Sequence, residues 1–231
     1  LDKEDITLNL KEAFNKLVED RFSQAVDSTK IATWIDFIDE WTDGGMRTKN
    51  LGIFVAATGE GKSLFLIELA YRIAKLENKK VLFITNELSI NEQTERFIAC
   101  VTNKHIKDII EDPTIATKEL ERHWGELQQN LLICETSGGT AINIESIIAR
   151  EYNLTGFKPA CIIVDYMERM QPVQSGHDPS ATWTKYGAIA KDLCVLAKKW
   201  DVLLWTAAQT NRSAFKSSKT ENEEVSLYLS S

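Results

Sequence analysis

The chain has 231 residues, of which 43% are hydrophobic and 26% are charged, and its formal net charge is −7. This composition is typical of a soluble protein, and the length suits one α/β domain with a substantial core. The acidic charge argues against indiscriminate binding to nucleic acid. It leaves room for a basic patch confined to one part of the surface.

The four cysteines lie far apart, with no C-x-x-C pair and no histidine at metal-ligand spacing. We expect Cys134 and Cys161 to be small buried hydrophobic residues, and the setting to be reducing and cytoplasmic. The opening residues 1–3 do not resemble a basic and apolar leader, so we expect no signal peptide, and no apolar run approaches the ~20 residues of a membrane helix. A first residue other than methionine indicates a fragment of a longer protein.

The amino-terminal region begins with an amphipathic pattern. Residues 6–26 place apolar side chains at helical spacing between charged ones, and we predict one helix there, followed by a short linker at 27–29. The next segment, residues 33–45, carries an apolar stripe that ends at a pair of glycines. We expect the stripe to pack into the core; its members are Trp34, Phe37, Ile38 and Trp41.

From residue 51 onward, strand and helix patterns alternate. Helical segments are predicted at 62–77, 89–129 (interrupted at Pro113), 143–153 and 188–200. Continuous apolar strands are predicted at 51–57, 80–87, 130–136, 160–166 and 201–209. Apolar strands separated by helices predict a parallel sheet covered on both faces. Such sheets bind ligands at the carboxyl ends of their strands.

The octapeptide AATGEGKS, residues 56–63, nearly matches the phosphate-binding loop G-x-x-x-x-G-K-[ST], with Ala56 in place of the first glycine. Backbone N–H groups that open a helix form a nest for phosphates, and glycines can take the positive φ that the nest requires. We predict that Lys62 contacts the β- and γ-phosphates and that the Ser63 hydroxyl binds Mg²⁺. The predicted nucleotide-binding residues are Thr58, Gly59, Glu60, Gly61, Lys62, Ser63 and Leu64.

Three more strand ends carry polar residues suited to nucleotide hydrolysis. Asp165 ends IIVD, where a carboxylate can hold Mg²⁺ through water. Glu87 closes VLFITNE and can act as the base that deprotonates the attacking water, or it is an ordinary solvated turn residue. Gln209 closes VLLWTAAQ, and its amide can sense a γ-phosphate. With Lys62, the latter two residues form the predicted catalytic set.

The loop after Gln209 contains three basic residues among serines and asparagines: Arg212, Lys216 and Lys219. They are candidates for contacts to single-stranded DNA, because phosphates can be bound in this way without sequence preference. The same composition also fits an ordinary solvated surface loop.

These motifs, in this order, resemble the RecA-like ATPase domain of DnaB-family replicative helicases, in particular those of large tailed bacteriophages. The phosphate loop with alanine in first place, the glutamate of FITNE, IIVDY and WTAAQ-x-N-R carry the resemblance, which covers residues 29–231. It implies a RecA-like P-loop fold at 29–231, preceded at 1–28 by a linker helix that docks on a neighbouring subunit.

The resemblance further implies a hexameric ring that hydrolyses ATP with Mg²⁺, moves along single-stranded DNA and unwinds duplex DNA during replication. Primase and a helicase loader are expected partners of the full-length protein, and a phage-infected bacterial cell is the expected location. The family's arginine finger follows the point where this sequence ends, and Arg212 is not its substitute. We therefore expect the sequence to be part of a longer protein.

Three other functions fit parts of the pattern. A RecA-type recombinase or repair ATPase has the same fold but forms a filament, and related contacts can give a ring or a filament. A non-hydrolysing loader or regulator would use the nucleotide only as a switch. Such a switch needs no catalytic carboxylate, so Glu87 argues against this function. A small-molecule kinase needs an arginine-rich lid over a second substrate, and the sequence has no such segment.

Overall fold

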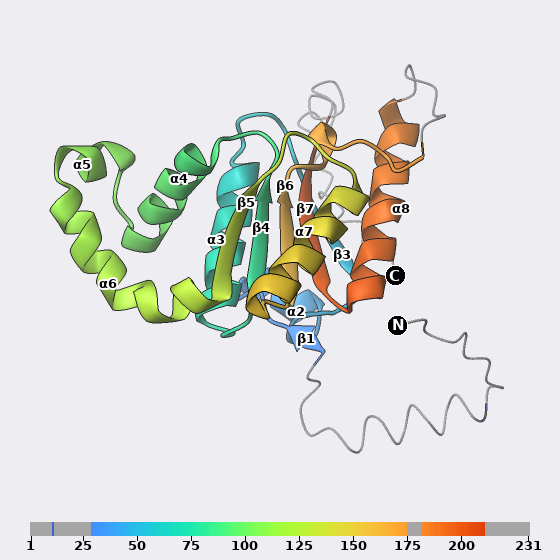
Figure 1. Cartoon of the computed structure of the whole chain (residues 1–231), viewed down its shortest axis with the longest axis horizontal. Helices are drawn as coiled ribbons and strands as arrows, with labels where there is room; N and C mark the ends of the chain where they lie inside the picture. Colours follow the sequence, from blue (N-terminus) through green and yellow to red (C-terminus); the bar gives the residue numbers. More distant parts are fainter. Residues whose placement is uncertain (1–10, 12–28, 175–181, 211–231) are drawn as a thin grey trace.

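The computed structural model describes residues 29–174 and 182–210, together with Lys11. Its centre is a five-stranded sheet in the order β3-β7-β6-β4-β5, in which every pairing is parallel (Figure 1). The predicted parallel sheet is therefore confirmed. The strands are β3 (Leu51–Ala56), β4 (Val81–Thr85), β5 (Leu131–Glu135), β6 (Cys161–Asp165) and β7 (Leu203–Gln209).

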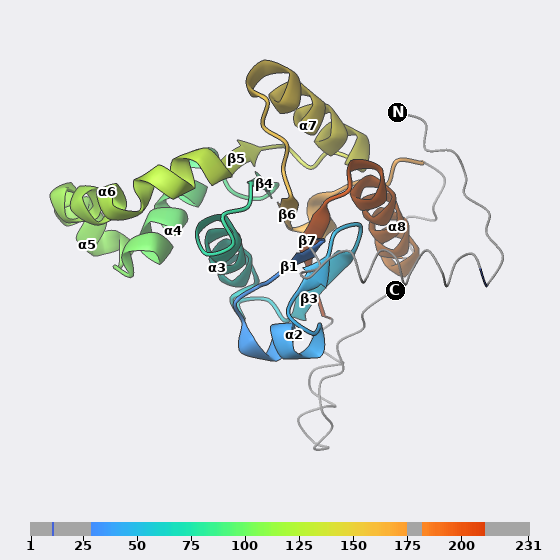
Figure 2. The same cartoon turned by 90° about the horizontal axis from the view of Figure 1, so that it is seen from below.

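Helices cover both faces of this sheet, as the sequence predicts (Figure 2). One face packs against α3 (Lys62–Lys75), α4 (Ile90–Thr102) and α6 (Pro113–Asn130), and the other packs against α7 (Ala141–Thr155) and α8 (Thr182–Trp200). Successive strand residues alternate between the two cores: Phe83 lies with α3, whereas Leu82 and Ile84 lie with α7 and α8. Continuous apolar strands thus supply both cores at once.

The long helical stretch predicted at 89–129 consists of three helices, with α5 (Ile106–Glu111) between α4 and α6. Ser89 starts α4 with a capping box, in which its side chain and that of Glu92 bond each other's backbone N–H groups. Pro113 opens α6, where its missing N–H has no cost, and Asp112 accepts from the backbone N–H of Thr114. Pro113 therefore separates two helices, which is the interruption that the sequence predicts.

A small substructure precedes β3. The short strands β1 (Lys30–Ile31) and β2 (Met46–Arg47) pair antiparallel, and α2 (Asp36–Trp41) lies between them in the chain. These two strands were not expected from the sequence. Each is only two residues long, too short to show an alternating pattern.

The prediction that the aromatic stripe of this segment enters the core is wrong. Only Ile38 is buried, whereas the exposed fractions of Trp34, Phe37 and Trp41 are 47%, 49% and 64%. A helix of six residues turns less than twice, so it can bury little more than one position. Trp34 lies before the helix, and its indole donates to the Glu77 carboxylate at 2.8 Å.

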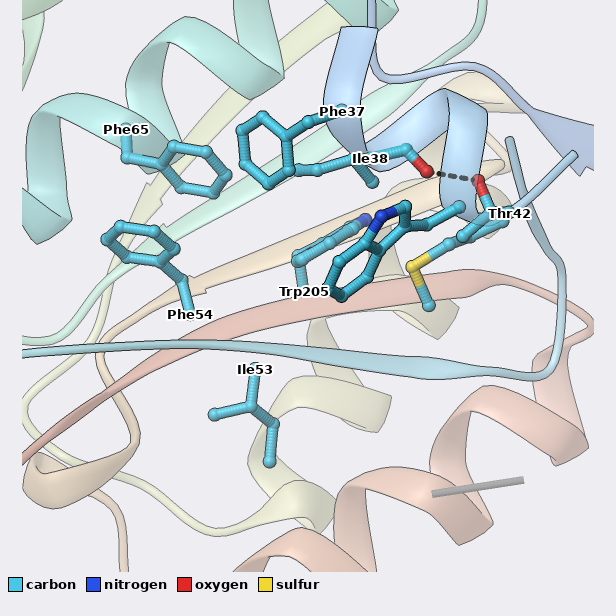
Figure 3. A pocket seen from close by; sticks show the side chains of 9 residues that line it. Phe37, Ile38, Thr42, Ile53, Phe54, Phe65 and Trp205 are labelled. Carbon is cyan, nitrogen blue, oxygen red and sulfur yellow. Dashed lines mark hydrogen bonds between the residues drawn. The ribbon is translucent and has the colours of Figure 1, made fainter. Parts of the chain in front are cut away.

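The exposed aromatic side chains of α2 form one wall of an apolar pocket, called here the α2 pocket (Figure 3). The rings of Phe54 and Phe65, from β3 and α3, stack at 4.1 Å between centroids on its opposite side. The full lining comprises Phe37, Ile38, Trp41, Thr42, Met46, Ile53, Phe54, Phe65 and Trp205. None of the predicted site residues lines this pocket.

Two predicted segments fall outside the described residues. They are the helix at 6–26, of which only Lys11 is described, and the loop that follows Thr210. In the part of the chain that is described, no helix combines the length and the apolar character needed to cross a membrane.

Candidate active site

The four predicted motifs meet at the carboxyl edge of the sheet. Ala56, the last residue of β3, pairs with Gln209, the last residue of β7. In the same way Asp165, the last residue of β6, pairs with Thr85, the last residue of β4. The strand ends are therefore level within each of these two pairs, and the loop after β3, the segment after β4, Asp165 and Gln209 all lie at the carboxyl edge of the sheet.

The phosphate loop has the backbone that the sequence predicts. Gly59 and Gly61 both have a φ of +83°, which disfavours a residue with a side chain. A Cβ atom at either position would meet no atom within 4 Å, so backbone conformation and not space favours glycine there. The loop passes directly into α3 at Lys62, so N–H groups at a helix amino terminus face the site. Thr58, Glu60 and Leu64 have exposed side chains.

The Lys62 side chain lies within the curve of the loop. It is 9% exposed, and its ammonium donates to the carbonyls of Ala56 and Ala57 at 3.3 and 3.1 Å. The ring of Tyr166, next to Asp165, lies 6.0 Å from the same ammonium. Neutral carbonyls and a ring are weak partners for a buried charge, whereas a phosphate would be a strong one.

Ser63 and Asp165 are in direct contact, since the Ser63 hydroxyl donates to the Asp165 Oδ1 at 3.0 Å. Asp165 is 1% exposed, and its Oδ2 is buried without a hydrogen-bond partner among the described residues. Burial raises the pKa of Asp165 to about 6; the hydrogen bond from Ser63 opposes this and the Glu87 carboxylate adds to it.

These two side chains suit a magnesium ion. A hydroxyl and a carboxylate with one unpartnered oxygen provide the hard oxygen ligands that Mg²⁺ prefers, and phosphates and water commonly complete its shell. Over the described ranges, no group of three or more His, Cys, Asp or Glu side chains could hold a metal by itself. A metal here would therefore depend on the nucleotide as well as on Ser63 and Asp165.

Glu87 lies beyond the strand that it was expected to close. Strand β4 ends at Thr85, so Glu87 stands two residues further, in the bend that leads to α4. The N–H of the intervening Asn86 donates to the Asp165 carbonyl at 2.9 Å, which fixes this bend beside β6. The Glu87 side chain is 35% exposed, and its Oε1 lies 3.6 Å from the Arg169 guanidinium. A half-exposed carboxylate at this edge can reach both solvent and a bound ligand.

Gln209 contacts the phosphate loop directly, because its side-chain amide donates to the Thr58 hydroxyl. Its backbone N–H donates to the Glu168 carboxylate. The next residue, Thr210, donates its N–H to the Ala56 carbonyl at 3.2 Å. The end of β7 is thus tied to the beginning of the phosphate loop. The predicted DNA-binding residues Arg212, Lys216 and Lys219 lie outside the described residues.

Sequence reasoning missed two charged residues at this edge, Glu168 and Arg169. Both belong to η1 (Met167–Arg169), a single 3-10 turn that follows β6. Two consecutive charged side chains, which begin three residues after the apolar strand 161–165 ends, were the available signal, because residues soon after a strand end lie at the ligand-binding edge.

Comparisons with known proteins identify the family to which the chain belongs. The family model of the DnaB-like helicase C-terminal domain matches residues 31–224. A DnaB-like replicative helicase of Enterobacteria phage T4 is 28% identical over 203 residues, which are 85% of this chain and 42% of that protein. The chain thus spans less than half of that relative.

Two solved structures share the fold. One is a DnaB-like replicative helicase described with its interactions with primase, at a TM-score of 0.74 and 19% identity, covering 92% of this chain and 51% of that one. The other is a structure described as an ATPase domain, at a TM-score of 0.73 and 18% identity, covering 90% of this chain and 73% of that one. The fold is therefore RecA-like, and by its family match the chain belongs to the DnaB-like helicase C-terminal domain family.

Proposed function

We propose that this chain is the motor domain of a ring-shaped replicative helicase, which hydrolyses ATP with Mg²⁺ to move along single-stranded DNA and unwind duplex DNA. The observation that carries the proposal is the contact between the Gln209 amide and Thr58 of the phosphate loop. Through this contact, the strand that leads into the candidate DNA-binding loop touches the candidate nucleotide site.

Each residue of the edge has a proposed part in hydrolysis. The backbone N–H groups of residues 58–64 surround the β-phosphate, and the Lys62 ammonium leaves its two carbonyl partners to neutralise the β- and γ-phosphates. Ser63 and Asp165 hold Mg²⁺, whose charge stabilises the carboxylate that burial disfavours. The ion supplies charge stabilisation on the transferring phosphoryl group.

Glu87 is the proposed general base. Its carboxylate extends from the segment beside Asp165, and the guanidinium of Arg169 lies next to it. A carboxylate at this position can accept a proton from a water molecule in line with the γ-phosphate. The Gln209 amide is proposed to contact the γ-phosphate, so that loss of this phosphate changes the position of Gln209 and of the loop at 211–224 that follows it.

Assembly and partners are part of the proposal, and family membership supports them. Copies of the chain form a hexameric ring in which the helix at 6–26 docks on the neighbouring subunit, and single-stranded DNA passes through the centre. Arg212, Lys216 and Lys219 contact its phosphates. Primase and a helicase loader are the proposed protein partners, in the cytoplasm of a phage-infected bacterial cell.

Membership of the DnaB-like family favours a helicase over a filament-forming recombinase. A nucleotide switch without hydrolysis is disfavoured because Glu87 lies at the same edge as Lys62, Ser63 and Asp165. Such a switch would need the three binding residues but no base.

The experiment that tests the proposal is single-strand binding and ATP hydrolysis by the full-length protein with both Lys216 and Lys219 changed to alanine. We expect weaker binding, a smaller dependence of affinity on salt and a loss of stimulation by single-stranded DNA, because fewer phosphates are neutralised. Hydrolysis without DNA should be largely retained.

The matched control changes Lys104 and Lys107 to alanine, which alters the net charge equally; both lysines are exposed, the first just before α5 and the second within it. This control should bind and respond to DNA like the parent protein. If the Lys216 and Lys219 variant also matches the parent in affinity, salt dependence and stimulation, the loop is not the DNA contact.

A further inference from the structure

The turn η1 lies between two of the proposed catalytic residues, Glu87 after β4 and Gln209 at the end of β7. It follows β6, and β6 lies between β4 and β7 in the sheet. Met167 before Glu168, and Met170 after the turn, are both buried in the core formed with α7 and α8. The Met170 N–H closes the turn on the Met167 carbonyl at 2.9 Å. These buried methionines thus hold the turn in place at the carboxyl edge of the sheet.

The end of β7 needs a hydrogen-bond partner on the side that faces η1. The pairing of β6 with β7 runs from Cys161 with Leu203 to Val164 with Thr206, whereas β7 continues to Gln209. On its other side, β7 stays paired with β3 as far as Gln209. The final residues of β7 therefore extend beyond their β6 neighbour. The Glu168 carboxylate accepts the Gln209 N–H in place of a sheet partner.

A carboxylate is a costly way to provide this one hydrogen bond. Glu168 is half-buried, and its Oε2 is buried with no hydrogen-bond partner among the residues that the structure describes. Burial raises the pKa of Glu168, an effect opposed first by the Gln209 N–H and more weakly by the Lys62 charge. A carboxylate with one oxygen left unsatisfied does not contribute much to stability. What the Glu168 carboxylate provides is a fixed position for the backbone of Gln209.

Two hydrogen bonds connect Glu168 to the phosphate loop through Gln209. Glu168 holds the backbone of Gln209, and the Gln209 side chain holds the hydroxyl of Thr58. Without the first hydrogen bond, the last residue of β7 keeps only its pairing with β3, and the direction of its side chain is less defined.

We infer that Glu168 is a positioning residue for hydrolysis: it fixes the end of β7 so that the Gln209 amide reaches the phosphate loop and the γ-phosphate. The inference rests on the proposed role of Gln209. Glu168 acts through Gln209 and does not itself touch the nucleotide.

The test is a double-mutant cycle of Glu168→Leu and Gln209→Ala in the full-length protein, with ATP, Mg²⁺ and single-stranded DNA. Loss of a hydrogen bond to a charged group predicts that Glu168→Leu lowers kcat about tenfold. The KM for ATP should change by less than about threefold, since the loop and Lys62 are intact. In the Gln209→Ala background, Glu168→Leu should cause no further loss, because residues that act as a unit are not additive.

Two further variants exclude a general effect on folding. Thr206→Val removes a buried hydrogen bond from the same strand, that of the Thr206 hydroxyl to the Val164 carbonyl, and should leave kcat near the parent value. Glu168→Gln keeps an acceptor oxygen for the Gln209 N–H and should restore kcat to within about threefold of the parent.

The outcomes separate this inference from the proposed function. Parent-like kcat in Glu168→Leu, a loss in Glu168→Gln as large as in Glu168→Leu, or effects that multiply in the double variant would each overturn the positioning role. If Gln209→Ala itself hydrolyses ATP like the parent, the proposed role of Gln209 fails, and the inference fails with it.

Discussion

The carboxyl edge of the sheet and the α2 pocket depart from the usual arrangement of a folded protein in opposite ways. At the carboxyl edge, polar atoms are buried without a partner among the described residues; they are Asn86 Nδ2, Asp165 Oδ2, Glu168 Oε2 and Thr210 Oγ1. At the α2 pocket, the aromatic side chains of Phe37 and Trp41 are about half exposed or more. One region keeps polar groups inside and the other keeps apolar groups outside.

The two departures have different physical consequences. Burying a polar atom without a hydrogen bond costs on the order of 1–3 kcal/mol, so the carboxyl edge is less stable than its packing allows. A bound nucleotide and metal would satisfy several of those atoms. Exposed aromatic side chains cost little, because much of every protein surface is apolar. Substitutions at the first region should therefore change function strongly, and those at the second should change little in this domain.

The largest expected effect at the carboxyl edge comes from Lys62→Ala. This change removes the buried ammonium proposed to oppose the β- and γ-phosphates, so tight binding and hydrolysis of ATP should be abolished. Binding is measured by calorimetry and turnover by phosphate release. If the Lys62→Ala variant hydrolysed ATP at the parent rate, the proposed role of the phosphate loop in hydrolysis would be wrong.

Asp165→Asn tests the cost of the buried carboxylate in the absence of nucleotide. The fold raises the pKa of Asp165 from 3.8 to about 6, so the folded state loses stability as the pH rises through this range. The asparagine variant should match the parent near pH 4 and be more stable above pH 6, by up to about 3 kcal/mol. Thermal unfolding from pH 4 to 8 measures this difference. A variant less stable than the parent at pH 8 would show that the carboxylate contributes to stability.

The smallest effect is expected at the α2 pocket. Trp41→Ser changes a side chain that is 64% exposed, and the free energy of unfolding should change by less than about 1 kcal/mol. The matched variant is Ile38→Ala on the same helix, where a 9% exposed side chain is lost and about 2 kcal/mol or more should disappear. Equal losses in urea unfolding would mean that α2 packs more tightly than its exposure indicates.

The difference between the regions also explains what the sequence could predict. All five strands of the sheet and the alternation of its two cores were predictable, because continuous apolar runs between helices have few other solutions. The location of Ser63, Asp165 and Gln209 at one edge followed, since the carboxyl ends of parallel strands lie at the same edge of a sheet. The placement of Glu87 beyond the strand end was missed by two residues, which is a common error at element boundaries.

Other features depended on tertiary contacts that no local pattern encodes. The exposure of Trp34, Phe37 and Trp41 is decided by how short α2 is and by which surface lies opposite it. The hydrogen bond from Gln209 to Glu168 exists because β7 extends past the paired part of β6, and neither strand length shows this by itself.

The central claim, that this edge hydrolyses a nucleotide and does not only bind one, is tested most directly by Glu87→Gln in the full-length protein. Binding of ATP with Mg²⁺ and turnover with single-stranded DNA are measured on one preparation, with Glu95→Gln, an exposed glutamate of α4, as the matched control. We predict that binding survives while turnover falls by about two orders of magnitude or more, the scale of a lost general base, and that the control matches the parent. Turnover close to that of the parent in Glu87→Gln would contradict the account and leave Glu87 as a turn residue.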